Sequence, residues 1–199
     1  NEGWVQIIAE KPLIILNSQE IRTDYKGKPA DINVIGVKRL IPHSLDIDET
    51  ARIGREEGGL VTICHGNSAY FSAGIDKTIE MVKTQKAHTA EGFNATEKPK
   101  VNKQLMQKLT QEGIKWIAVP DSYHYKQNGA AGVIFPEKIL NQFSRENLIS
   151  YIESGNFENY FSQIGMFGTF ITHKLPILIS IPIHAVKNTR QILNALTKR

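Results

Sequence analysis

The chain has 199 residues, of which 41% are hydrophobic, and a formal net charge of +4 at pH 7. This length suits one domain, and the apolar content is sufficient for a hydrophobic core. The lysines are scattered, and no array of aromatic and basic residues accompanies them, which argues against a nucleic-acid-binding surface. We therefore predict a single α/β domain over residues 1–199, in which residues 1–45 could form a β-rich N-terminal extension.

The only cysteine, Cys64, excludes an internal disulfide and a cysteine-based metal site. This cysteine usage favours a reducing compartment, so we expect a cytoplasmic protein or one secreted into a reducing host cytosol. No apolar run reaches the ~18 residues of a transmembrane helix, and we expect no membrane span.

The first part of the chain predicts mostly strands. Strands are expected where apolar and β-branched residues cluster, at residues 4–9, 13–16 and 32–41. Residues 19–29 are polar and contain a glycine and a proline, so they are predicted as a loop.

The rest of the chain alternates strands and helices. Strands are predicted at residues 60–64, 114–119, 133–135 and 177–183. Helices are predicted at residues 49–57, 76–86, 101–112, 136–142, 145–153 and 188–197. Asp46 or Asp48 is the expected cap of the first helix, and the polar residues 88–99 are predicted as a loop. This order predicts a layered α/β fold of three layers, with a mixed sheet that is largely parallel in its C-terminal half and helices on both faces.

The most informative segment is a buried strand that ends in a small polar loop before a helix. The loop contains Cys64-His65-Gly66-Asn67-Ser68 and then Ala73-Gly74-Ile75-Asp76. A helix N-terminus offers backbone N–H groups and a partial positive charge to an anion. Since ligands of parallel sheets bind at the carboxyl edge, the loops at 64–76, 120–132 and 184–188 are expected to meet there.

Several polar residues of these loops are candidates for chemistry. His65 and Asn67 are either a polar pair presented to a ligand or parts of a turn. Asp121 and His124 could do acid–base work together, or could belong to a Pro-Asp-Ser turn.

Three further residues also have two interpretations. Asp76 is either a ligand-binding carboxylate or a helix cap, and His184 is either a ligand contact or a half-buried core residue. Cys64 is best explained as a small buried residue, because it and His65 point to opposite faces of the strand. The six histidines lack the spacing of a metal site, so no metal is expected.

Residues 60–79, 115–120 and 179–183 resemble the macrodomain, an α/β fold that binds ADP-ribose. The resemblance implies that Asn67 contacts the distal ribose and that Asp31 takes the place of the adenine-contacting Asp. It also implies that backbone N–H groups wrap the diphosphate at Ser72, Ala73, Gly74 and Ile75. The loop that begins at His184 would hold the second phosphate.

Two other families resemble parts of the same loop. Residues 71–76 are similar to the oxyanion loop of crotonases, and His65-Gly66 is similar to the His-Gly of ADP-ribosyltransferases. A crotonase would need a downstream glycine-rich helix start, and a transferase would need a Tyr and a catalytic Glu that cannot be placed.

Two functions are therefore expected as alternatives. The first is binding of ADP-ribose or a related nucleotide diphosphate, with or without hydrolysis of an ADP-ribosyl bond. In that case Asn67 orients the ribose and a water, and His65 or Asp121 is the general acid or base. The second is a non-catalytic protein-interaction domain, an adaptor or secreted effector, which the aromatic residues between 157 and 170 favour. The expected partner is a nucleotide or another protein, and no cofactor is expected.

Overall fold

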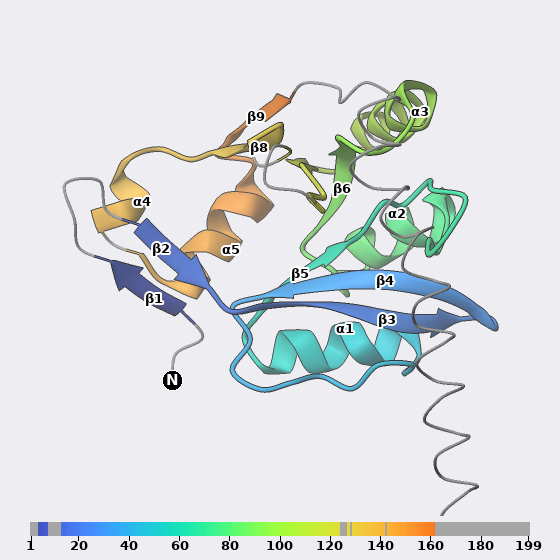
Figure 1. Ribbon diagram of the computed structural model, residues 1–199, viewed down its shortest axis with the longest axis horizontal. Helices are drawn as coiled ribbons and strands as arrows, with labels where there is room; N and C mark the ends of the chain where they lie inside the picture. The colour runs from blue at the N-terminus through green and yellow to red at the C-terminus, as the bar shows by residue number, and fades with distance from the viewer. Residues whose placement is uncertain (1–3, 8–12, 124–126, 128, 142, 162–199) are drawn as a thin grey trace, which may run out of the picture.

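A computed structural model describes residues 4–7, 13–123, 127, 129–141 and 143–161. Its centre is a five-stranded sheet whose order follows the chain (Figure 1). The strands are β3 (Ser18–Tyr25), β4 (Lys28–Ile35), β5 (Leu60–Ile63), β6 (Thr89–Asn94) and β7 (Trp116–Val119). β3, β4 and β5 pair antiparallel, whereas β5, β6 and β7 pair parallel. The predicted α/β class, with a mixed sheet that is parallel in its later part, is confirmed.

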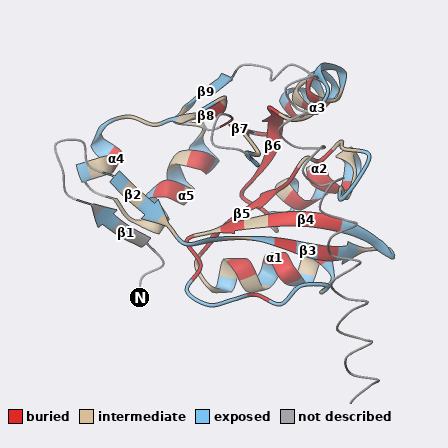
Figure 2. Ribbon diagram, in the orientation of Figure 1, coloured by how far each residue is buried: buried red, intermediate tan, exposed pale blue. Residues whose placement is uncertain are grey.

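Helices pack against both faces of this sheet. The main core joins β3, β4 and β5 to α1 (Ile47–Glu56), α2 (Ile75–Lys83) and α3 (Pro99–Gln111). On the opposite face, a smaller core joins β5 and β7 to α4 (Lys138–Asn141) and α5 (Arg145–Ser154). Buried residues follow the central strands and the inner sides of the helices (Figure 2).

Two small antiparallel sheets complete the described fold. One pairs β1 (Trp4–Ile7) with β2 (Leu13–Leu16), and the other pairs β8 (Ala131–Ile134) with β9 (Glu158–Phe161). Asn159 of β9 caps the edge of β7, because its Oδ1 accepts from the Ala118 N–H at 2.7 Å and its Nδ2 donates to the Trp116 carbonyl at 2.9 Å. The unpaired backbone groups of an edge strand can pair with another protein chain. At β7 the Asn159 amide satisfies two of these groups instead.

The prediction of a loop at residues 19–29 is wrong. These residues form β3, a two-residue turn at Lys26-Gly27 and the start of β4. Both turn residues have positive φ angles, 56° and 75°, as in the turns that suit the twist of a hairpin. The strand signal is an alternation in which Ile21 and Thr23 are buried between polar residues.

The prediction of a loop at residues 88–99 is also wrong, because β6 lies there and all six of its residues are buried. The strand gives no hydrophobic signal in the sequence, because its buried residues include the polar Thr89, Glu91 and Asn94. Gly92 has no space for a side chain, because a Cβ there would collide with the Trp116 indole on the neighbouring strand. The strand predicted at 32–41 lies instead at Lys28–Ile35, and it ends there because the chain turns at Gly36 with φ 83°.

The helix signals in the sequence hold for α1 and α5. Asp46 caps α1 by accepting from the backbone N–H groups of Asp48 and Glu49, and Ser144 caps α5. The strand and helix predicted at 177–183 and 188–197 lie outside the described residues. Within the part of the chain that the structure describes, no helix is long and apolar enough to cross a membrane.

Candidate functional site

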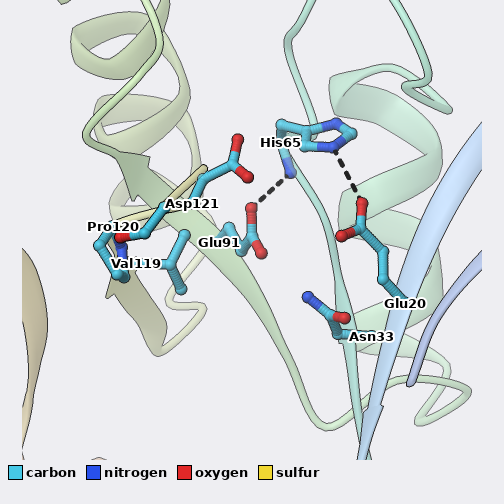
Figure 3. Close-up of a pocket in the computed structure, with 8 residues that line it drawn as sticks. Glu20, Asn33, His65, Glu91, Val119, Pro120 and Asp121 are labelled. Carbon is cyan, nitrogen blue, oxygen red and sulfur yellow. Dashed lines mark hydrogen bonds and ion pairs between the residues drawn. The ribbon is translucent and has the colours of Figure 1, made fainter. Parts of the chain in front are cut away.

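A pocket of about 290 Å³ lies where the parallel strands end. Its lining residues come from β3, β4, β6 and β7 and from the segments that follow β5 and β7: Glu20, Asn33, His65, Glu91, Val119, Pro120, Asp121 and Ser122. Figure 3 shows Glu20, Glu91 and Asp121 arranged around His65. Three carboxyl groups and an imidazole thus meet at the edge where ligands of parallel sheets bind.

The alternation of the β3–β4 hairpin supplies one wall of this pocket. Ile21 and Ile32 turn into the main core, so their neighbours Glu20 and Asn33 face the other way. The segments after β5 and β7 supply His65 and Asp121.

His65 is held by its main chain and surrounded by carboxylates. Its φ is 30°, in the left-handed region that non-glycine residues rarely adopt. Its Nε2 lies 3.9 Å from Glu20 Oε1 and 3.9 Å from Asp31 Oδ2. Burial by itself lowers the pKa of His65, but the nearby Glu20 carboxylate and the charges of Glu91, Asp121 and Asp31 raise it to about 9. His65 is therefore a cation at neutral pH.

Glu91 is the most buried carboxyl of the lining, with 4% of its surface exposed. Its Oε2 accepts from the backbone N–H of His65 at 2.9 Å. Burial raises the pKa of Glu91 to about 7, against the opposing charge and N–H of His65. A carboxyl with this pKa can give up or take a proton near neutral pH, which is a property of catalytic acids.

Asp121 is oriented by two hydrogen bonds to one of its oxygens. Its Oδ2 accepts from Asn94 Nδ2 at 3.1 Å and from Thr96 Oγ1 at 3.0 Å. Its backbone also has a positive φ, 45°, so two neighbouring parts of the pocket wall, Asp121 and His65, hold uncommon backbone conformations. Such conformations cluster at functional sites.

A half-buried ion pair, Arg22 with Asp31, lies beside the pocket. Arg22 donates to both oxygens of Asp31, from Nε at 2.9 Å and from Nη2 at 3.1 Å. Asp31 is 3% exposed, whereas the side chain of Arg22 is 47% exposed. The ring of Phe71 packs against the guanidinium, 3.6 Å from its Cζ.

Glu20, Asp31 and His65 are the described residues that group three possible metal-ligand atoms, all within 4.8 Å of one another. Carboxylates and imidazole together suit a divalent transition metal. However, both oxygens of Asp31 already accept from Arg22, so a metal ion would have to displace this ion pair. The arrangement therefore fits proton transfer better than metal binding.

The structure divides the candidate residues of the sequence between two places. His65 and Asp121 lie together in the pocket. Asn67, Ile75 and Asp76 line a second, more open hollow of about 580 Å³ between α2 and α3. The Asn67 amide nitrogen lies 3.4 Å from the Val101 carbonyl, away from the carboxylates.

The predicted anion-binding loop makes bonds of its own. Ser72 Oγ accepts from the Gly74 N–H at 3.1 Å, and Ala73 packs against the main core. Gly74, with φ 86°, caps α2 through its backbone, and Asp76 lies in the first turn of that helix. The two histidines His124 and His184 lie outside the described residues.

Sequence reasoning did not select Glu20, Arg22 or Glu91 for the site. Glu20 and Arg22 alternate with Ile21 and Thr23, and this alternation was the available signal. Glu91 lies in β6, which the sequence predicted as a loop because its residues are polar. Its burial depends on segments far away in the sequence.

Comparison with known proteins gives no family for this chain. No model of a known protein family matches the sequence, and no curated protein matches it.

Proposed function

We propose that this protein is a hydrolase that cleaves a bond to the anomeric carbon of a sugar, with Glu91 as the general acid. The observation that carries the proposal is the pairing, in one pocket, of a buried carboxyl that titrates near pH 7 with an oriented second carboxylate, Asp121. Hydrolysis of glycosyl bonds commonly uses two carboxyl groups whose environments give them different protonation states.

The roles of the two groups follow from their partners. Glu91 Oε1 has no hydrogen-bond partner among the described residues, so it can donate a proton to the leaving oxygen or nitrogen. Asp121 Oδ2 is occupied by Asn94 and Thr96, which leaves Oδ1 to face the positive charge that develops on the sugar. His65 holds the Glu91 carboxyl in place through its backbone N–H.

The charge of the pocket supports the same reaction class. Among its lining residues are three carboxyl groups, Glu20, Glu91 and Asp121, and one cation, His65, while the adjacent Arg22–Asp31 pair adds no net charge. This excess of carboxylates favours a positively charged transition state and disfavours a phosphate group at the pocket floor. The ADP-ribosyl bond is one bond of this class, provided that its phosphates lie away from the floor.

The test is hydrolysis of nitrophenyl glycosides and of N-ribosyl compounds by four proteins: wild type, Glu91→Gln, Asp121→Asn and Glu137→Gln. Glu137 is an exposed control outside the pocket. Removing a general acid should lower kcat by about 10²-fold or more, whereas the control should match wild type. No hydrolysis by the wild type between pH 5 and 9, or full activity in Glu91→Gln, would reject the assignment.

A protein-interaction domain is a second candidate, and exposed aromatic residues on β9 favour it. Tyr160 and Phe161 are 42% and 44% exposed, whereas Phe157 packs into the smaller core. Phe167 and Phe170 lie outside the described residues. If this candidate is right, Tyr160→Ser lowers partner binding and Glu91→Gln leaves it unchanged. Unchanged partner binding in Tyr160→Ser would reject this candidate.

A further inference from the structure

The buried carboxylate of Asp31 holds the Arg22 guanidinium in one orientation. Two of its nitrogens, Nε and Nη2, donate to the two oxygens of Asp31. Such a paired fork fixes the plane of the guanidinium as well as its position. Although Asp31 is buried, about half of the Arg22 side chain is exposed to solvent.

Phe71, in the loop after β5, makes a further contact with the Arg22 guanidinium. Phe71 places its ring 3.6 Å from Arg22 Cζ, and its carbonyl accepts from the Asp31 N–H at 2.9 Å. To do so, Phe71 adopts φ 56°, which is costly for a bulky residue. Backbone strain of this kind persists only where the surrounding contacts fix it, and strained residues cluster at functional sites.

Arg22 lies beside the catalytic pocket. Glu20, two residues earlier on the same face of β3, lines the pocket. Asp31 Oδ2 is 3.9 Å from Nε2 of His65, another lining residue. The third nitrogen of Arg22, Nη1, has no hydrogen-bond partner among the described residues. A pre-oriented, partly exposed N–H donor thus remains on a side chain that neighbours the lining residues Glu20 and His65 through β3 and Asp31.

We infer that Arg22 binds an oxyanion of the substrate through Nη1, so that the substrate is a glycosyl compound that carries a phosphate or carboxylate group. This inference rests on the proposed hydrolase function. The lining carboxylates Glu91 and Asp121 repel such a group, whereas the Arg22 guanidinium beside the pocket attracts it. The substrate is thereby oriented with its anion outward and its anomeric carbon near Glu91 and Asp121.

The competing explanation is that Arg22 only neutralises Asp31. The two explanations are separated by replacing the pair together, Arg22→Gln with Asp31→Asn, because this double variant removes both charges and leaves no unpaired carboxylate. Binding of ribose 5-phosphate, glucuronate and neutral ribose is measured by isothermal titration calorimetry at low ionic strength. The method needs no turnover, so it decides the role of Arg22 separately from whether Glu91 is an acid catalyst.

We expect wild type and Glu91→Gln to bind one of the two anionic sugars at least tenfold more tightly than ribose. The double variant should lose this preference while its affinity for ribose stays within about twofold. Preference for ribose 5-phosphate identifies the anion as a phosphate, and preference for glucuronate identifies it as a carboxylate.

Two results would overturn the inference. One is a wild type that binds neither anionic sugar more tightly than ribose, and the other is a double variant that keeps the preference. If the double variant does not fold, Arg22→Lys decides, because lysine keeps the charge but lacks the fork. At least a threefold loss of preference in Arg22→Lys supports the inference, and an unchanged preference rejects it.

Discussion

The backbone N–H of His65 donates to Oε2 of Glu91 across 2.9 Å and so ties the end of β5 to the middle of β6. This bond belongs to the main chain, so the Glu91 carboxyl keeps its position when the His65 side chain is replaced. The imidazole acts on Glu91 separately, through its positive charge, which lowers the pKa of that carboxyl. Position and protonation of Glu91 can therefore be changed independently.

Replacing His65 by Asn should raise the pKa of Glu91 above 7, because the opposing cation is lost while the backbone bond remains. Asparagine tolerates the left-handed conformation that residue 65 adopts. The shift can be followed by carbon NMR of the Glu91 carboxyl, and in an active enzyme the alkaline limb of the pH–rate profile should move upward with it. An unchanged or lower titration midpoint would show that the His65 charge does not reach Glu91.

Glu91→Gln should make the protein more stable at pH 8 and change little at pH 4. The folded-state pKa of Glu91, about 7, lies above its ordinary value of 4.5. The stability linked to its protonation is therefore fully present below pH 4.5 and is lost as the pH rises through 7. Glutamine removes this loss, a gain on the order of 2–3 kcal/mol in the free energy of unfolding at pH 8.

Urea unfolding at the two pH values measures this gain, with the exposed Glu137→Gln as the matched control. Greater stability combined with lost activity is the expected signature of a functional residue kept in an unfavourable environment. Equal stability of Glu91→Gln and wild type at pH 8 would contradict the shifted titration.

Acid should destabilise the protein through His88. Burial and the charge of Arg55 lower the pKa of His88 to about 4, and its Nδ1 accepts the Val61 N–H at 2.9 Å. Because the folded-state value lies below the ordinary 6.5, the stability linked to neutral His88 is present above pH 6.5 and is lost as the pH falls through 4. The loss is on the order of 2–3 kcal/mol. In His88→Gln, unfolding measured from pH 7 to pH 4 should lose less stability than in wild type; parallel curves would exclude His88 as the cause.

Asn159→Ala should destabilise the fold by about 2–3 kcal/mol, because it leaves the Ala118 N–H and the Trp116 carbonyl without their partners. Asn159→Ser keeps an acceptor and a donor on a shorter side chain and so retains part of this capping. Its unfolding free energy, from urea titration, should fall between those of wild type and Asn159→Ala. If Asn159→Ala has the same urea midpoint of unfolding as wild type, the two hydrogen bonds of Asn159 to β7 do not stabilise the fold.

Gly92→Ala should also be destabilising, by about 2 kcal/mol or more, since its Cβ would collide with the Trp116 indole. Trp116→Val removes the ring and should make the added methyl group nearly neutral. The four proteins of this double-mutant cycle are compared by thermal unfolding. A cost of Gly92→Ala that is the same in both backgrounds would show that the indole is not its cause.

The sequence by itself determined the elements whose signals are local. Apolar spacing and capping residues predicted α1, α2, α3, α5 and the buried strands β5 and β7, because these signals act within a few residues. The rule that ligands bind at the carboxyl edge of parallel strands led to the loops that contain His65 and Asp121, and these two residues do line one pocket.

Only the tertiary structure decided what surrounds those two residues. Glu20 reaches the pocket through the pairing of β3 with β4, and Glu91 through the parallel pairing of β6 between β5 and β7. The pKa of Glu91 depends on burial by segments distant in the chain, and Asn67 is separated from the pocket because its amide turns toward α3. A sequence specifies which ionisable groups are available. Their burial and the charges next to them depend on the pairing of strands distant in the chain, and burial and nearby charges set the pKa values on which the chemistry depends.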